Sequence, residues 1–146
     1  MIVFGCSGAG AGVVEKEYTS ADLQGLNDGD RFTMVIWDLA GQSHFEEIAN
    51  FYIQGSAGII IVFDVNNKKS FHNISRWKAI YDRICPKAEI LIVGNKTDLE
   101  NVISENDMKS IEDKFNSKIQ FVSAKNDYNV QNIFQLIASK ILHTQK

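Results

Sequence analysis

Apolar runs alternate along the chain with stretches in which apolar residues recur every three or four positions. Two of these runs are continuous, Ile59–Val65 and Ile90–Val93, which is typical of strands buried on both faces of a parallel sheet. Shorter runs rich in β-branched and aromatic residues predict three more strands, at Met1–Phe4, Phe32–Trp37 and Ile119–Val122. The pattern therefore predicts at least five strands.

A sixth strand is expected just before Phe32. Leu23–Leu26 forms a short apolar segment, and Asn27-Asp28-Gly29 follows it. An Asn/Asp-Gly sequence between two apolar segments indicates a hairpin turn. We therefore expect a hairpin over about Ala21 to Trp37, which would place an antiparallel strand at the edge of the sheet.

The helical period appears in three places between and after these strands. The first is Phe71 to Ile84. The second follows a helix start at Ser104 that has an acidic first turn, and the third is Val130 to Ile141 near the end of the chain. Strands that alternate with helices predict an α/β fold with a doubly wound, mostly parallel sheet. In that architecture ligands bind beyond the carboxyl ends of the strands.

Composition narrows the class of protein. The chain has 146 residues, 45% of them hydrophobic and 23% charged, and a net charge of −3. This balance predicts one globular domain over residues 1–146 and gives no reason to expect nucleic acid as a partner. Two cysteines and no apolar run of membrane-spanning length favour a reduced, cytoplasmic protein.

Glycines follow the first predicted strand. Gly5 opens the loop, Gly8 lies within it, and Gly10 closes a spacing of four intervening residues, which is how a phosphate-binding loop begins. The Lys and Ser/Thr that would complete such a loop are replaced by Ala11 and Gly12. Backbone N–H groups from Gly8 to Gly12 remain candidates for binding a phosphate.

A second candidate loop follows the strand Phe32–Trp37. Asp38 ends that strand, where a carboxylate can hold Mg²⁺ through water. Gly41 can bring its backbone N–H close to a phosphate, and Gln42 can orient a water molecule for attack. An ordinary turn between strand and loop is the competing interpretation of the same residues.

Two more loops carry the chemistry for reading a base. Asn95, Lys96 and Asp98 follow the strand Ile90–Val93. The Asp98 carboxylate can accept two N–H groups from guanine, a donor pair that adenine lacks, so it would select the base. After the strand Ile119–Val122, Ser123-Ala124-Lys125 offers backbone N–H groups for the guanine O6, with Lys125 beside the base.

Together these segments resemble the small GTPases of the Ras superfamily, and the Rab family most. The resemblance lies in IWDLAGQSHF, FYIQGSAGIIIVFDV, GNKTDL and FVSAK and spans Asp28 to Leu142. It implies the small G-protein fold, with GTP or GDP and Mg²⁺ as ligands. It also implies that Asn95, Lys96, Asp98 and Ser123–Lys125 bind guanine, and that Asp38, Gly41 and Gln42 serve Mg²⁺, the terminal phosphate and the hydrolytic water.

The first part of the chain departs from this family. Loss of the loop Lys and hydroxyl would weaken phosphate binding by roughly 10²- to 10⁴-fold. If a hairpin occupies Ala21 to Trp37, only Val13 to Ser20 remain for a first helix and a first switch, which is too few. Thr19 and Ser20 are the candidates for the hydroxyl that the first switch would supply.

Three interpretations follow. The first is a guanine-nucleotide switch with weak affinity and little hydrolysis, acting in vesicle trafficking or signalling. The second is a pseudo-GTPase that binds proteins only, through a patch of Trp37, Phe45 and Tyr52, although Trp37 could equally be a core residue. The third is a shortened product of a longer gene. The chain ends without a cysteine, so we expect no direct lipid anchor and leave recruitment to membranes by partners open.

Overall fold

A computed structural model describes residues 2–6, 12–40, 50–51 and 53–144, and of residues 2–6 it describes the backbone alone. It contains a six-stranded sheet in the order β2-β3-β1-β4-β5-β6. The strands are β1 (Ile2–Cys6), β2 (Gly12–Thr19), β3 (Arg31–Ala40), β4 (Gly58–Asp64), β5 (Glu89–Asn95) and β6 (Ile119–Phe121). Strand β2 pairs antiparallel with β3, and every other neighbouring pair is parallel. The predicted fold class, a mostly parallel sheet with one antiparallel edge strand, is confirmed.

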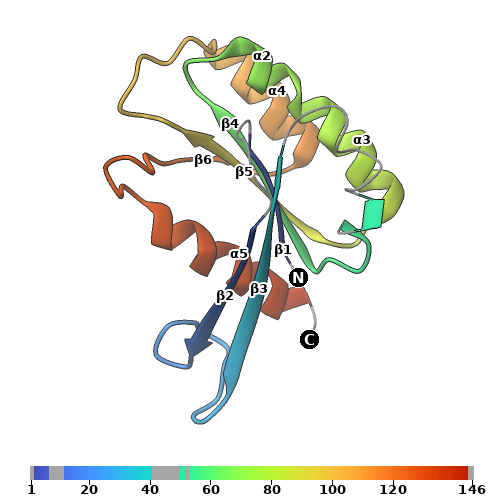
Figure 1. The fold of residues 1–146 in the computed structure, drawn as a ribbon, viewed down its shortest axis with the longest axis vertical. Helices are drawn as coiled ribbons and strands as arrows, with labels where there is room; N and C mark the ends of the chain where they lie inside the picture. Colours follow the sequence, from blue (N-terminus) through green and yellow to red (C-terminus); the bar gives the residue numbers. More distant parts are fainter. Residues whose placement is uncertain (1, 7–11, 41–49, 52, 145–146) are drawn as a thin grey trace.

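Helices cover the two faces of this sheet unequally. They are α2 (Lys68–His72), α3 (Ile74–Ile84), α4 (Glu105–Phe115) and α5 (Val130–Thr144). Figure 1 shows α2, α3 and α4 together on one side of the sheet and α5 on the other. A separate hydrophobic core lies on each side, one with Ile61 and Phe63 at its centre and the other with Ile60 and Leu91. Alternate residues of the same buried strand therefore supply both cores, which explains its continuous apolar run.

The edge strand lies earlier in the chain than predicted. The expected strand at Leu23–Leu26 is wrong, because the partner of β3 is Gly12–Thr19 and residues 20–30 connect the two strands. The chain turns after β2, where the Thr19 N–H and hydroxyl both donate to the Asp22 carboxylate. This turn directs Leu23, 2% exposed, into the core beneath α5. The apolar character of Leu23 thus reflects its burial in that core and not a place in a strand.

The Asn27-Asp28-Gly29 turn forms, but it leads directly into β3. Asp30 accepts hydrogen bonds from the backbone and side chain of Asn27, and Gly29 has φ of +89°. That backbone conformation is open to glycine and strained for other residues. The turn signal was correct, and the assumption that a strand must precede it immediately was not.

The segment between β1 and β2 is too short for a helical crossover. Only five residues lie between Cys6 and Gly12, and a helical crossover needs at least ten to twelve. The expectation that the first helix is shortened or absent is therefore confirmed. The reason differs in detail, since Val13–Thr19 form the edge strand itself.

The helix predicted over Phe71 to Ile84 is interrupted at Asn73. Asn73 ends α2, with its N–H directed to backbone carbonyls of that helix, and α3 begins at the next residue. Phe71 and Ile74, on either side of the junction, are both buried in the same core, so the apolar period continues across it. The predicted helix start at Ser104 is confirmed, because its hydroxyl accepts the Asp107 N–H at 3.1 Å. Among the helices of the described residues, none is long and apolar enough to cross a membrane.

Candidate nucleotide site

The two predicted base-reading loops lie side by side at the carboxyl edge of the sheet. Strands β5 and β6 are parallel neighbours, with Gly94 opposite Phe121, so the residues that follow them emerge together. The loops are joined by backbone hydrogen bonds, including Val122 N–H to Gly94 C=O at 2.9 Å and Thr97 N–H to Val122 C=O at 3.2 Å. Segments about 25 residues apart in sequence thus form one rigid surface.

A short hydrogen bond joins the two loops through their side chains. The Ser123 hydroxyl donates to Asp98 Oδ1 at 2.6 Å. Ser123 is buried and Asp98 is exposed, so the serine holds the carboxylate from beneath while leaving it accessible. This hydrogen bond, aided by the positive charges of Lys125 and Lys96, lowers the pKa of Asp98. The carboxylate is therefore ionised at neutral pH and able to accept N–H donors.

Asn95 fixes the backbone around it. Its side-chain oxygen accepts the N–H of Lys96 at 2.7 Å and the N–H of Ala124 at 3.1 Å. One of the N–H groups expected to meet guanine, that of Ala124, is therefore already donated to Asn95. The structure assigns Asn95 to holding the two loops together.

Lys96 reaches across to the neighbouring strand. Its ammonium lies 2.7 Å from Oδ2 of Asp64, the last residue of β4. Asp64 and Asn95 are partners in the register between β4 and β5, so the ion pair joins two adjacent strand ends. The side chain of Lys96 is 52% exposed and that of Asp64 is 12% exposed. Lys96 also adopts a left-handed backbone with φ of 65°, uncommon for a residue with a side chain.

Asp64 was not identified from the sequence as a site residue. Its position could have indicated it, because Asp64 ends the continuous apolar run of β4 at the same edge of the sheet as the other candidate residues. A carboxylate at the end of a buried strand is a candidate ligand-binding residue on the same grounds as Asp38.

The loop after β6 is held by its own backbone. Ser123 and Tyr128 exchange two backbone hydrogen bonds of 3.1 and 2.9 Å, closing a tight loop that contains Ala124 and Lys125. Asn129 donates from its side chain to the Phe121 carbonyl at 3.0 Å, just before α5 begins. Ala124 and Lys125 are exposed at the tip of this loop.

Asp38 lies in a different part of the same edge. It is in β3, opposite Gly12 of β2 and Phe4 of β1 in the strand register. Its side chain is exposed, yet neighbouring atoms remove part of its hydration, and this desolvation raises the pKa of Asp38. Across the part of the chain that the structure describes, no group of three or more His, Cys, Asp or Glu side chains gathers as a metal site.

The candidate hydroxyls for a first switch are placed elsewhere. Thr19 is at the end of β2 remote from Gly12, paired with Arg31, and its hydroxyl donates to Asp22 at 3.0 Å. Ser20 follows it into the turn. The structure therefore does not bring either hydroxyl near Asp38, and the suggestion that they replace a switch residue is wrong.

Several predicted residues lie outside the described part of the chain: Gly8, Gly10, Ala11, Gly41, Gln42, Phe45 and Tyr52. Gly5 lies within β1, with Leu39 and Ile61 as register partners on the two neighbouring strands. Gly12 begins β2. Trp37 is half-buried on β3, with Val13 as its register partner on β2.

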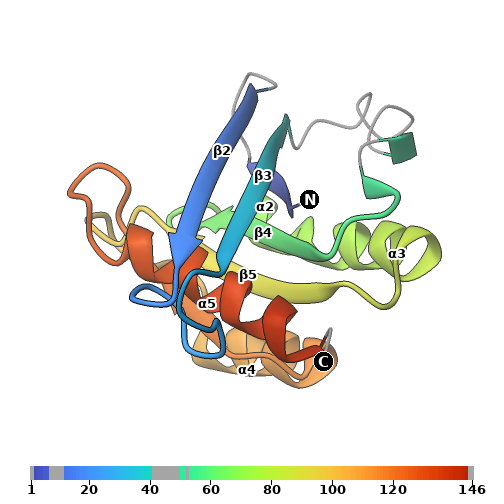
Figure 2. The ribbon, with the colours of Figure 1, turned by 90° about the horizontal axis from the view of Figure 1, so that it is seen from below.

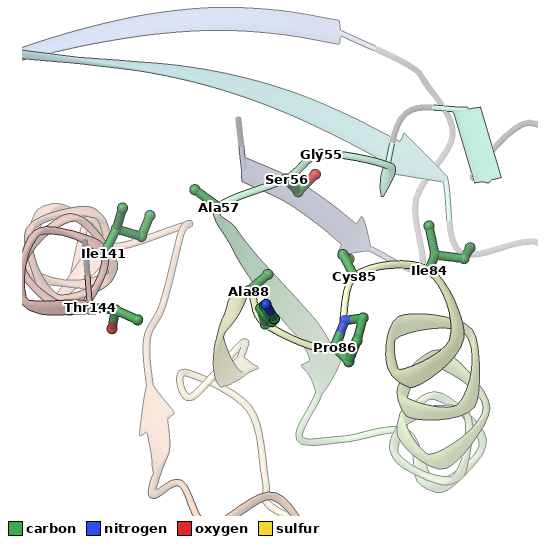
Figure 3. A pocket seen from close by; sticks show the side chains of 10 residues that line it. Gly55, Ser56, Ala57, Ile84, Cys85, Pro86, Ala88, Ile141 and Thr144 are labelled. Atoms are coloured by element: carbon green, nitrogen blue, oxygen red, sulfur yellow. The ribbon is translucent and has the colours of Figure 1, made fainter.

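A wider hollow of about 520 Å³ lies at the opposite edge of the sheet. Figure 3 shows it between the end of α3, where Ile84 and Cys85 lie, and the end of α5, where Ile141 and Thr144 lie. These residues are at the amino ends of β4 and β5, away from Asp98 and Ser123. The hollow is thus separate from the base-reading loops despite its size.

Comparison with known proteins agrees with this geometry. The model of the Ras family matches residues 13–143. The Ras-related protein Rab-1D of Dictyostelium discoideum is 39% identical over 117 residues, covering 78% of this chain and 57% of its own length. The GTP-binding protein YPTM2 of Zea mays is 38% identical and the Ras-related protein Rab-8A of Gallus gallus 37% identical over the same number of residues. The chain spans less than two thirds of the length of these relatives. With its family-model match over nearly the whole chain, it belongs to the Ras family and is a Rab-like small GTPase homologue.

Proposed function

We propose that the chain binds guanine nucleotides through the loops that follow β5 and β6. The observation that carries this proposal is the hydrogen bond from Ser123 to Asp98, which holds an exposed, ionised carboxylate at the carboxyl edge of the sheet. Asp98 would accept the two N–H donors of guanine, and Lys96 and Lys125 would flank the base. Asn95 would keep the two loops in register.

This arrangement favours guanine over adenine. Adenine lacks the donor pair, so its binding would bury the Asp98 carboxylate without a hydrogen-bond donor from the base. A polar group left unpaired in a binding site produces strong discrimination. The N–H of Ala124 is engaged by Asn95, so we expect the guanine O6 to be met by Lys125 or to compete for the Ala124 N–H.

The phosphate half of the site is proposed to be weak. Gly5, Gly8, Gly10, Ala11 and Gly12 supply no cationic side chain and no hydroxyl. The chain enters strand β2 at Gly12, so these residues also lack a following helix whose positive end would face the phosphates. We therefore expect weak discrimination between GTP and GDP.

Hydrolysis is expected to be slow for the same reason. Gly41 would meet the terminal phosphate and Gln42 would orient water. Mg²⁺, when bound, neutralises charge on the phosphate oxygens. Asp38 would hold it through water, with phosphate oxygens among the remaining ligands.

We also propose cytoplasmic action through protein effectors or regulators. The region of Trp37, Phe45 and Tyr52 is the candidate contact surface, and membrane recruitment would depend on those partners. A pseudo-GTPase that binds only proteins is the second candidate. The observation that favours it is strand β2 itself, which occupies the residues that would otherwise form a helix after the glycine loop.

A titration with fluorescent GDP and GTP, with and without Mg²⁺, tests the proposal. We expect saturable binding that Asp98→Asn abolishes, because the amide can accept only one of the two guanine donors and adds a repelling N–H. Asp107→Asn is the matched control, since it makes the same change on the exposed first turn of α4. Fluorescent ATP should bind neither protein.

Two outcomes would contradict the proposal. If the folded protein binds no guanine nucleotide at high micromolar concentration, the pseudo-GTPase interpretation replaces it. If Asp98→Asn binds as tightly as the parent, the nucleotide lies elsewhere. Circular dichroism of each variant establishes that the comparison is between folded proteins.

A further inference from the structure

The α5 side of the sheet is left partly uncovered by helices. Among the described residues, three helices pack on one face and α5 alone on the other (Figure 1). Strands β2 and β3 extend past α5, so that none of the described helices lies beside the Gly12 end of β2 (Figure 2). A sheet face without a covering helix exposes apolar side chains unless another element packs on it.

An apolar cavity of about 160 Å³ lies on this face, between the sheet and the first half of α5. Its lining is Val62, Val93, Asn95, Val122, Ala124, Val130, Ile133 and Phe134. Six of these eight are large apolar side chains, which come from β4, β5, the segment directly after β6, and α5. A cavity of this size and lining accommodates one large apolar side chain, as engineered cavities of about 150 Å³ accommodate benzene.

The exposed surface continues from the cavity onto β2. The Lys16 ammonium donates to Gln131 at 3.2 Å and lies 4.8 Å from the centre of the Phe134 ring, which lines the cavity. Val14 is two residues away on the same strand and therefore on the same face. It is 55% exposed, a large value for a valine beside a hydrophobic core.

The rim of this surface is positive near α5. Lys16 contributes a full charge there. The first turn of α5 contains no acidic residue, so the partial positive charge of its N-terminus is not offset by its own side chains. Asp38 lies on the same face but farther along β3, opposite Gly12. The charge therefore changes from positive beside α5 to negative at the far end of the surface.

We propose that this surface, formed by the cavity with Val14 and Lys16, docks an acidic amphipathic helix of a partner protein. The partner helix places one large apolar side chain in the cavity and covers Val14 with a second apolar side chain. Its carboxylates lie at the end next to Lys16 and the start of α5. The partner helix completes the layer that α5 begins. The cavity shares Asn95 and Ala124 with the loops after β5 and β6, so the test uses nucleotide-free protein.

A displayed library of helical peptides tests this directly. Each peptide has about 18 residues, roughly 27 Å when helical, with fixed apolar positions at three- and four-residue spacing and Glu, Lys or Ser elsewhere. Selection on the nucleotide-free protein should enrich Glu at the end that meets Lys16. Replacing the central apolar anchor by Ala should weaken binding about ten-fold or more, by loss of its burial.

Variants of the protein locate the site. Lys16→Glu should weaken the selected peptides about ten-fold or more, because a charge-assisted contact becomes repulsion. Val14→Glu should do the same, and Val13→Glu is its matched control. The two valines are neighbours with exposures of 55% and 53%, and they lie on opposite faces of β2. Val13→Glu should leave binding unchanged.

Three results would overturn the proposal. The first is a library that yields no saturable binder, or binders indifferent to both Lys16→Glu and Val14→Glu. The second is benzene shifting the methyl resonances of Val62 and Val93 while no helix binds, which would make the cavity a small-ligand site. The third is self-association of the chain that Val14→Glu abolishes, seen by sedimentation, which would make the surface a contact between two copies.

Discussion

Lys96 and Asp64 form an ion pair of 2.7 Å that joins the ends of β5 and β4. Asp64 is buried, and its other carboxylate oxygen accepts the Asn66 N–H at 2.8 Å. The acid is therefore fixed by its surroundings, and the more exposed lysine is held by it. This contact ties a proposed base-flanking side chain to the core of the sheet.

Replacing Asp64 by Asn should loosen Lys96 while retaining the acceptor for the Asn66 N–H. We expect guanine-nucleotide affinity to fall about three- to ten-fold, since one hydrogen-bonded contact no longer positions the lysine. Isothermal titration calorimetry measures the affinity. Asp82→Asn is the control, because it breaks the 2.7 Å pair of Lys78 with Asp82 on α3, away from the site. Equal affinities for the two variants would exclude a positioning role for Asp64.

Ser123→Ala should raise the pKa of Asp98 toward the usual value of 3.8. The Ser123 hydrogen bond is the main cause that lowers this pKa in the folded chain. Because the folded pKa is depressed, ionised Asp98 favours folding at pH values above the unfolded pKa, and this contribution is lost as pH falls through the folded value. An NMR titration of the Asp98 carboxyl carbon in both proteins measures the shift. Identical titration curves would show that the hydrogen bond has no electrostatic effect.

Gly94→Ala should destabilise the fold. A Cβ at Gly94 would lie 3.0 Å from ring atoms of both Phe121 and Phe63, and neither ring can yield as a flexible chain end would. Overpacking of this kind costs about 1–3 kcal/mol of unfolding free energy. Gly12→Ala is the matched control in another strand, with no atom within 4 Å, and should change stability by less than about 0.5 kcal/mol. Urea unfolding compares them, and equal midpoints would contradict the packing.

Cys85 should react slowly with thiol reagents in the native protein. Its side chain is 8% exposed, and burial raises the pKa of its thiol to about 11. Ellman's reagent at pH 8, applied to a Cys6→Ser variant, should label Cys85 of the native protein only as fast as the fold opens. In urea, where the chain is unfolded, labelling of Cys85 should be immediate. This thiol ionises at a lower pH in the unfolded chain than in the folded one. The free energy of unfolding should therefore fall as pH rises from 9 toward 11. Rapid labelling of the native protein would contradict the burial.

The positions of the two loops that follow β5 and β6 could be predicted from the sequence because the signals that place them are local. Asn95, Asp98 and Ser123 directly follow strands that the apolar pattern identifies, and parallel strands bring their carboxyl ends to one edge. The Ser104 helix start was likewise readable from a few adjacent residues. Such features depend on residues that are neighbours in the chain, so they can be predicted without the tertiary structure.

The edge strand could not be placed in the same way. Leu23–Leu26 was predicted as the partner of β3, because the turn signal indicated a strand immediately before Asn27. The structure pairs Gly12–Thr19 with β3 and buries Leu23 beneath α5, a helix more than 100 residues later. Competing strand pairings differ in long-range burial, which a local pattern does not contain.

By itself, the sequence determined the alternation of strands and helices, the apolar runs that fill two cores, and the polar residues at the strand ends. These follow from side-chain periodicity and from short capping and turn signals. Tertiary structure alone decided that Gly12–Thr19 is the edge strand, that Lys96 pairs with Asp64, and that Lys16 lies over Phe134 beside an apolar cavity. Each of these contacts joins residues on separate elements, and its energy depends on how those elements pack together.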